Sequence, residues 1–300
     1  MKKIIALGFF DGVHLGHQAL LRACSALAKQ QNMTPAAITF ETHPQAFFTA
    51  TPPAQINTSA DRDALLRQFG MAEIIRLPVN EKVMSTPWQA FLEDLIAQGA
   101  AGFVCGNDFR FGHKGAGDAA RLQAFCREKD LPCTIVPEQQ LGGIRISSTH
   151  IRSLLEGGDM AQATQFLGHP HILTGEVISG RRLGRTLGIP TANLSLPEAL
   201  IVPKFGVYAC LACFEGKKLP AVTNIGNRPT VGGHRITVEP WILDFDGDLY
   251  GKEITLEFYA FIRPEQKFPT LEDLKAQIQR DAKTAKELLG RGGNLPPAGD

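Results

Sequence analysis

Apolar residues in the first half of the chain form short runs that alternate with segments of helical periodicity. Short runs of this kind are typical of strands that are buried on both faces of a sheet. We expect such strands at residues 3–10, 36–40, 72–78, 102–106 and 132–137. We expect helices between them at residues 17–31, 59–70, 86–98 and 117–130. Strands that alternate with helices predict parallel βαβ units and a doubly wound α/β domain.

From His171 onward, one strand pattern follows another, and turn sequences such as EGKK and FDGD separate them. The strands are expected at residues 172–179, 206–215, 219–226, 235–245 and 253–263. This series predicts an antiparallel sandwich or barrel. A terminal helix is expected at residues 270–289, where Thr270 and Asp273 have the spacing of a capping box.

The pattern changes near FLGHPHIL, residues 166–173, so we expect two domains, 1–168 and 169–289. A length of 300 residues agrees with two domains. Residues 290–300 are rich in Gly and Pro and are expected to form a disordered tail.

Composition and charge exclude several classes of protein. The chain has 31 basic and 30 acidic residues, and a net charge of +1 argues against a large nucleic-acid surface. The first apolar run is too short for a signal peptide, and no window approaches a membrane span. We therefore expect a cytoplasmic protein, a monomer or weak homo-oligomer, without nucleic-acid or membrane partners.

The six cysteines lack the dense spacing of a disulfide framework, which favours free thiols in a reducing compartment. Cys210 and Cys213 form a C-x-x-C pair. A zinc site would need a second pair, and none is suitably spaced. The pattern therefore favours two thiols carried by one strand over a redox or zinc half-site.

Candidate chemistry begins at GFFDGVHLGHQ, residues 8–18, between the first predicted strand and the first predicted helix. A helix N-terminus presents free N–H groups and a positive dipole end to phosphate. His14 and His17 would face the same side there, and Gly16 allows close approach of a ligand. Phosphate binding is the favoured interpretation, with two surface histidines or a metal pair as alternatives.

Further polar residues lie where a sheet of this type binds ligands. Asn107 and Asp108 follow the predicted strand 102–106, at its carboxyl end. Ser147, Ser148 and Thr149 are expected to cap the next helix and turn its N–H groups toward phosphate. Arg152, one turn further along, has the planar fork that clamps phosphate.

The second half contains a separate Gly- and Arg-rich segment, SGRRLGRTLGIPTAN, residues 179–193. Its backbone N–H groups are suited to phosphate, although an ordinary surface loop is an equally good interpretation of the segment alone. If the segment enters a strand, Thr191 and Asn193 share one face. A hydroxyl and an amide oxygen on one face are suitable ligands for Mg2+ beside a triphosphate.

Taken together, these motifs resemble one known family. The H-x-G-H sequence at His14–His17 is similar to the signature of the nucleotidyltransferase superfamily. The motifs GFFDGVHLGHQ, TFETHP, GNDFRFGHKGAGD and RISSTHIR resemble, in order, those of the prokaryotic bifunctional riboflavin kinase/FMN adenylyltransferase (FAD synthetase) family. GRTLGIPTAN, KFGVYA, NIGNRPT, VEPWILDF, DLYG and FIRPEQKF resemble its kinase half, so that the resemblance covers roughly residues 3–288.

The resemblance implies a Rossmann-like nucleotidyltransferase domain and a six-stranded riboflavin kinase-like barrel with a terminal helix. It implies phosphorylation of riboflavin to FMN by ATP with Mg2+, and then adenylylation of FMN to FAD with release of pyrophosphate. The adenylyltransferase residues that it implies are His14 and His17 with Gly8, Phe10, Asp11, Gly16, Asn107, Asp108, Ser148, Thr149 and Arg152. The kinase residues that it implies are Gly180, Gly184, Arg185, Gly188, Pro190, Thr191 and Asn193, the last two as metal ligands.

The same resemblance makes Glu239 the kinase base, since a phosphoryl acceptor hydroxyl needs a carboxylate within hydrogen-bond reach. Pro240 follows it directly, and proline in a strand predicts an edge or a bulge. Trp241 stands where the family often has His. These departures leave two alternatives: an adenylyltransferase with a weakened kinase, or a flavin-binding regulator.

Overall fold

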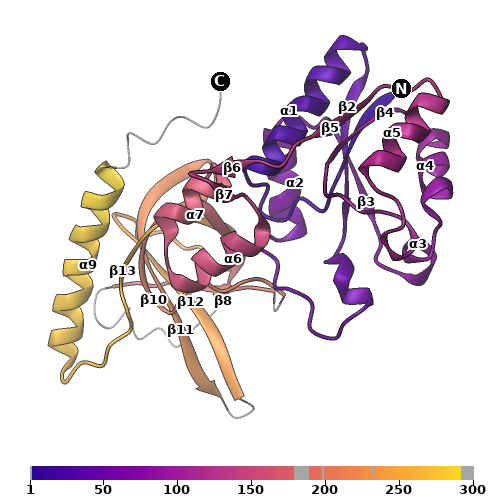
Figure 1. Ribbon diagram of the computed structural model, residues 1–300. Coiled ribbons are helices and arrows are strands. Elements are labelled where there is room, and N and C mark those ends of the chain that lie inside the picture. Colours follow the sequence, from indigo (N-terminus) through magenta and orange to yellow (C-terminus); the bar gives the residue numbers. More distant parts are fainter. Residues whose placement is uncertain (1, 179–188, 198, 231–232, 292–300) are drawn as a thin grey trace. The chain divides into compact units, whose positions relative to one another are not determined.

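The computed structural model describes residues 2–178, 189–197, 199–230 and 233–291 (Figure 1). Contacts divide the chain into two compact units, residues 1–148 and 149–300, here called the N-terminal and C-terminal units. The sequence pattern grouped residues 149–168 with the first half, whereas their contacts group them with the second. The functional boundary at residue 168 stays a prediction. Gly180, Gly184, Arg185, Gly188 and most of the predicted tail lie outside the described residues.

The N-terminal unit is built on a parallel sheet, as predicted. Its strands are β1 (Lys3–Leu7), β2 (Thr34–Phe40), β3 (Glu73–Leu77), β4 (Ala100–Gly106) and β5 (Cys133–Val136). They lie in the order β3-β2-β1-β4-β5, and each neighbouring pair is parallel. The strand order reverses between β1 and β4, and a crevice for ligands forms at such a switch point, at the carboxyl ends of the strands.

Helices cover both faces of this sheet, which explains why its strands are apolar throughout (Figure 1). The helices are α1 (Leu15–Gln30), α2 (Ser59–Gln68), α3 (Glu81–Met84), α4 (Trp88–Ala97) and α5 (Ala119–Glu128), with 3-10 turns at Pro44–Phe47 and His113–Gly115. Ile5 and Leu7 of β1 share a buried cluster with Leu92 of α4 and Leu122 of α5. On the other face, the thiol of Cys24 in α1 donates to the carbonyl of Ile4. A small hairpin, β6 (Gln140–Leu141) and β7 (Ile144–Arg145), follows β5.

The C-terminal unit is a closed barrel, which decides between the predicted sandwich and barrel. Its elements are α6 (Ser148–Gly157), α7 (Met160–Leu167), β8 (His171–Ile178), β9 (Asn193–Ser195), β10 (Gly206–Phe214), β11 (Lys217–Thr230), β12 (Gly233–Ile242), β13 (Glu253–Arg263) and α9 (Leu271–Arg291). Six strands close in the order β10-β11-β12-β9-β8-β13, and the pairings are antiparallel. Within the described ranges, no helix is long and apolar enough to cross a membrane.

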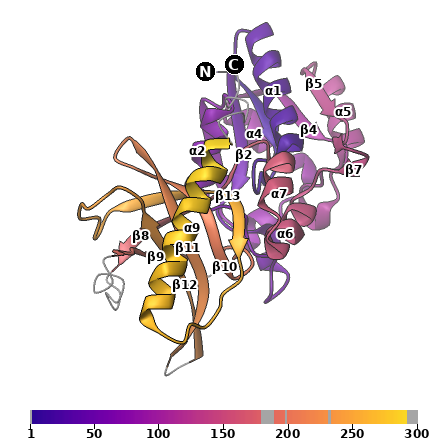
Figure 2. The same ribbon diagram turned by 90° about the vertical axis from the view of Figure 1, so that its left-hand side faces the viewer.

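The terminal helix α9 packs along the outer face of the barrel (Figure 2). Val207, Ala209 and Val222 of the barrel share a buried cluster with Ala285 of the helix. At its start, Asp273 N–H donates to the hydroxyl oxygen of Thr270 at 3.1 Å, and this confirms the predicted cap. Buried apolar surface and a cap together fix the helix against the strands.

Side chains on β10 alternate between the outer and inner faces of the barrel. Cys210 is fully buried on the inner face, whereas Cys213 lies on the outer face and its thiol contacts Glu257 Oε1 at 3.6 Å. All six cysteines are free, as predicted. Two thiols on opposite faces of one strand cannot chelate one metal ion. The C-x-x-C pair is therefore two thiols carried by one strand and not half of a zinc site.

The inner face of the barrel contains one unusual polar side chain. His171 of β8 is 1% exposed, packs against the ring of Phe258, and has no hydrogen-bond partner among the described residues for either ring nitrogen. Burial, and secondarily His169, lowers the pKa of His171 to about 3. The folded barrel therefore holds this imidazole in its neutral form.

We expect acid to destabilise the barrel through His171. The unfolded chain binds a proton near pH 6.5 and the folded barrel does not until about pH 3, so stability falls as pH drops below 6.5, by about 2 kcal/mol at pH 5. His171→Phe should remove this loss. In a Trp88→Phe background, fluorescence of Trp241 reports unfolding of the barrel alone, because the chain has 2 tryptophans. Equal losses at pH 5 in both proteins, or a loss removed by substituting the exposed His113, would contradict the expectation.

The prediction of an edge or a bulge at Pro240 is wrong. The register between β11 and β12 runs unbroken from Ala221↔Ile242 to Thr230↔Gly233, and β12 lies inside the closed barrel. The carbonyl of Pro240 accepts from Ala192 N–H at 2.9 Å. In a strand, the N–H and C=O of one residue point to the same side, so the missing N–H faces β9. Among the described residues, β9 pairs with β12 at Val238↔Leu194 alone. The proline therefore removes a hydrogen bond only where the ladder is already short.

Candidate functional site

A cavity of about 250 Å³ in the N-terminal unit lies at the predicted switch point. Its wall comes from the segments that follow β1, β4 and β5 and from the residues around β7 and the start of α6. Residues predicted from sequence that line it are Gly8, Phe10, His14, Gly16, His17, Asn107, Asp108, Ser147 and Ser148. Segments far apart in sequence therefore meet at one site, as expected for the carboxyl edge of a doubly wound sheet.

The loop between β1 and α1 is tightly folded. Phe10 and Val13 have positive φ angles of 59° and 39°, a conformation uncommon for residues other than glycine. A Cβ on Gly8 would come within 2.9 Å of the Phe10 ring, so glycine is required there for close packing. Strained backbone of this kind is retained where the surroundings hold it in place, often at functional sites.

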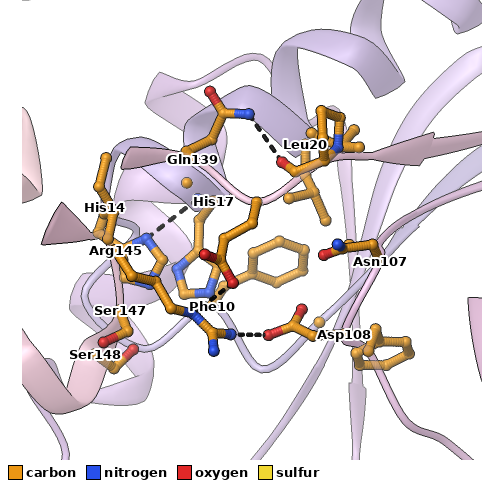
Figure 3. A pocket seen from close by; sticks show the side chains of 18 of the residues that line it. Phe10, His14, His17, Leu20, Asn107, Asp108, Gln139, Arg145, Ser147 and Ser148 are labelled. Carbon is orange, nitrogen blue, oxygen red and sulfur yellow. Dashed lines mark hydrogen bonds and ion pairs between the residues drawn. The ribbon is translucent and has the colours of Figure 1, made fainter. Parts of the chain in front are cut away.

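The two histidines of the loop lie against each other (Figure 3). Their rings are stacked, with centroids 3.6 Å apart and an interplanar angle of 13°. The sequence pattern placed His17 at the start of the helix, but α1 begins at Leu15 and His14 is its N-cap. His14 Nδ1 accepts from the N–H of His17 at 3.2 Å. A neutral His14 ring therefore carries its proton on Nε2.

The surroundings of His17 affect its charge. Burial of the ring, with smaller effects of His14 and Arg62, lowers the pKa of His17 well below its usual value. The site thus holds His17 as a neutral imidazole at pH 7. The metal alternative finds no support, since the described residues contain no group of three or more His, Cys, Asp or Glu side chains placed to hold a metal ion.

Sequence reasoning missed the arginine of the cavity wall. Arg145 of β7 forms ion pairs with Asp108, after β4, and with Glu138, after β5, the second at 3.0 Å (Figure 3). The signal was the sequence LGGI: Gly142 and Gly143 have φ angles of 57° and 78°, as a tight hairpin turn requires. That turn brings Arg145, the residue before ISST, to the cavity.

The remaining predicted residues of this site lie apart from the cavity wall. Asp11 belongs to the loop itself and is buried. Its Oδ1 accepts from Ile56 N–H at 2.8 Å, and its carbonyl accepts from the hydroxyl of Ser148 at 2.9 Å. It therefore ties the loop to the segments around Ile56 and Ser148. Thr149 and Arg152 are the next residues of α6 and belong to the C-terminal unit. Their contact with a nucleotide stays a prediction from the motif.

A second cavity, of about 560 Å³, lies in the C-terminal unit. Pro190 and Thr191, predicted from sequence, line it together with Val177, Pro240 and Ile242. The loop from Phe245 to Tyr250 closes one side. The Gly- and Arg-rich segment does lead into a strand, at Asn193, so Thr191 precedes β9.

Glu239 of β12 and Asn193 of β9 lie next to each other on neighbouring strands. Because Val238 pairs with Leu194, the next residues, Glu239 and Asn193, are opposite one another on the same face. Asn224 of β11 is the partner of Glu239 on its other side, which gives a polar row across β9, β12 and β11. Glu239 is half-buried and points to the face opposite Pro240.

Comparison with known proteins agrees with both halves of the structure. The FAD synthetase family model matches residues 1–150, and the riboflavin kinase family model matches residues 167–289. A structure titled as a macrolide-efflux protein from Streptococcus pneumoniae is 30% identical, with a TM-score of 0.86, and covers 95% of this chain and 94% of its own. The two-unit architecture is thus shared over nearly the full length.

Curated relatives match over the same length. The bifunctional riboflavin kinase/FMN adenylyltransferase of Escherichia coli (strain K12) is 38% identical over 96% of this chain and 93% of its own. That of Listeria monocytogenes is 32% identical over 97% of this chain and 94% of its own. The chain therefore belongs to the bifunctional riboflavin kinase/FMN adenylyltransferase family, and it is an enzyme that phosphorylates riboflavin to FMN and adenylylates FMN to FAD.

Proposed function

We propose that the cavity at the switch point carries out adenylyl transfer, with residues 1–168 as the adenylyltransferase domain. The observation that carries this proposal is the stacked pair His14 and His17 at the N-terminus of α1, in the wall of the cavity. A phosphate oxygen of FMN attacks the α-phosphorus of ATP, the bond to the β-phosphate oxygen breaks, and pyrophosphate leaves. The phosphate oxygen is already a nucleophile, so no covalent enzyme intermediate is needed.

In this proposal the histidines stabilise charge that develops on the α-phosphate. His14 donates through Nε2–H, since its Nδ1 is engaged by the N–H of His17. His17 donates as a neutral imidazole, because burial lowers its pKa. Fixed donors that face the developing charge supply the largest single contribution in many enzymes. Ser148, Thr149 and Arg152 hold the leaving pyrophosphate with a hydroxyl pair and a planar cation.

The barrel, residues 169–289, is proposed as the kinase domain, with Glu239 orienting or deprotonating the ribityl hydroxyl of riboflavin. The half-burial of Glu239 and its place opposite Asn193 support this role. Thr191 and Asn193 offer the hard oxygen donors that Mg2+ prefers, and few protein ligands suffice because this ion retains water and phosphate ligands. When bound, Mg2+ would neutralise charge on the phosphates of ATP.

Both activities are tested in one product analysis. We expect the protein to convert riboflavin, with ATP and Mg2+, to FMN and then FAD, and to convert supplied FMN directly to FAD. Chelation of Mg2+ by EDTA should stop FMN formation. If the protein makes FAD from supplied FMN but no FMN from riboflavin, the alternative of an adenylyltransferase with a weakened kinase holds. If it converts neither riboflavin nor FMN, the alternative of a flavin-binding regulator holds.

Thr191→Val tests the kinase metal ligands. The change keeps the shape of the side chain and removes its oxygen, so we expect roughly tenfold or greater loss of FMN formation and a rise in the Mg2+ concentration needed. FAD formation from supplied FMN should not change. The control is Thr174→Val, on β8, where the hydroxyl contacts that of Thr255. Equal Mg2+ dependence in the two variants would exclude Thr191 as a ligand.

The partners expected from this function are riboflavin, FMN and ATP. A cytoplasmic location, the absence of nucleic-acid partners and a monomeric or weakly oligomeric state stay predictions from sequence.

A further inference from the structure

A fully buried arginine lies behind the adenylyltransferase loop, outside the cavity wall. Arg62 of α2 is 0% exposed. Its guanidinium donates to the carbonyl of Phe40 at 2.5 Å, to Gln55 Oε1 at 3.3 Å and to the hydroxyl of Ser59 at 3.4 Å. A buried cation is costly unless its surroundings compensate it, so its retention calls for an explanation.

The same guanidinium touches the loop that carries the histidines. Its central carbon lies 4.6 Å from the centroid of the Phe9 ring, a cation–π contact. The ring of Phe9 also meets His43 edge-on at 4.9 Å, and the hydroxyl of Thr39 donates to the Phe9 carbonyl at 2.7 Å. Phe9 is thereby held between α2 and the end of β2. Its carbonyl and ring fix the chain one residue before the strained Phe10.

The charge of Arg62 has a partner in the same loop. Asp11 interacts electrostatically with Arg62, and its side chain accepts from the N–H of Ile56. Asp11 is 2% exposed, so little solvent screens this attraction. Arg62 therefore holds the chain on both sides of Phe10, through the Phe9 ring and through the carboxylate of Asp11.

We propose that Arg62 is a positioning residue for adenylyl transfer, and that it acts through Phe9 and Asp11 to hold His14 and His17 in place without touching substrate. The inference rests on the proposed adenylyltransferase role of the N-terminal cavity. An arginine fits the task better than a lysine, because its planar group stacks on a ring and donates in several directions at once.

Arg62 has a second effect on the site, through its charge. It is one of the groups that lower the pKa of His17, after burial and His14. The charged groups of the cavity wall are Asp108 after β4, Glu138 after β5 and Arg145 on β7, and those that act on Arg62 are Asp11, Asp63 and Arg76. Loss of the buried cation should therefore raise the pKa of His17 while these surroundings stay the same.

The test compares Arg62→Met with Arg67→Met, an exposed arginine of the same helix. We expect Arg62→Met to lower kcat for FAD formation from supplied FMN roughly 10- to 100-fold, since small misplacement of catalytic groups has effects of this size. KM for ATP should change less than threefold. FMN formation from riboflavin should stay within twofold of that of the unmodified protein. In NMR titration of the imidazoles, His17 should take up its proton at a higher pH in Arg62→Met than in Arg67→Met.

Arg62→Lys keeps the charge and loses the planar fork, so we expect an intermediate kcat and an unchanged titration of His17. If Arg62→Met does not fold, Phe9→Leu removes the stacked ring and should lower kcat without affecting FMN formation. FAD formation by Arg62→Met or Phe9→Leu at the rate of Arg67→Met would overturn the inference. An equal fall of both activities in Arg62→Lys would do so too. Failure of the unmodified protein to make FAD would instead count against the proposed function.

Discussion

Replacement of His14 by alanine is expected to lower FAD formation from supplied FMN by roughly 100- to 1,000-fold, the usual cost of losing one donor to a developing oxyanion. The ring stacks on His17 and lines the cavity, so its removal takes away one donor and the partner that orients the other. FMN formation from riboflavin should be unaffected. Separate measurement of kcat for the two half-reactions, by chromatography of the flavins, checks both statements.

Alanine also removes the cap of α1, which by itself costs roughly 0.5–2 kcal/mol of stability. His14→Asn separates the two effects, because asparagine is a good N-cap but cannot reproduce the reach of an imidazole. We expect it to recover the melting temperature and not the rate. His113→Ala, at an exposed histidine of the same unit, is the control. Recovery of the rate by His14→Asn would show that His14 serves only to cap the helix.

Glu239→Gln is expected to have the opposite pattern, a loss of roughly 100- to 10,000-fold in FMN formation with FAD formation from supplied FMN intact. Glutamine keeps the size and hydrogen-bonding capacity of the side chain but cannot accept a proton. The position opposite Asn193 is retained, so the barrel should fold and bind riboflavin as before. A riboflavin fluorescence titration checks the binding, and the rate of FMN formation checks the chemistry.

The control for this variant is Glu253→Gln, an exposed glutamate on another strand of the barrel. It makes the same change of charge away from the polar row. Kinase activity that survives Glu239→Gln while riboflavin affinity falls would assign Glu239 to binding, and the base would have to be sought elsewhere in the barrel.

The sheet and most of the barrel could be predicted because their strands are long enough to show a pattern of apolar and polar residues. The five parallel strands of the N-terminal unit fall within or next to the predicted apolar runs. β9 has no strand pattern of its own and was considered only as a condition, since the three residues Asn193–Ser195 are too few for an alternating pattern and pair chiefly through tertiary closure of the barrel. The prediction at Pro240 was wrong for a related reason. The cost of a proline depends on whether a neighbour needs its N–H, which only the register reveals.

The site was predictable as a set of motifs but not as a geometry. The spacing of His14 and His17 indicated a phosphate site, and the switch point explains why it meets Asn107 and Asp108. Sequence could not indicate that the rings stack, because stacking depends on His14 adopting the cap conformation rather than a helical one. Arg62 carried no signal at all, since its role comes from Phe9 and Asp11, which are distant in sequence.

The hydrogen bond from the Ser148 hydroxyl to the Asp11 carbonyl spans 137 positions of sequence. During synthesis, the first residues therefore leave the ribosome long before Ser148 is available to bond the loop around His14. At roughly 5–20 residues per second, that interval lasts on the order of 7–30 s. A ribosome-bound chain that ends before residue 148 should then hold β1 and α1 while the loop around His14 lacks its bond to Ser148. The loop around His14 thus receives this support from the last residue of the N-terminal unit, before synthesis of the barrel begins.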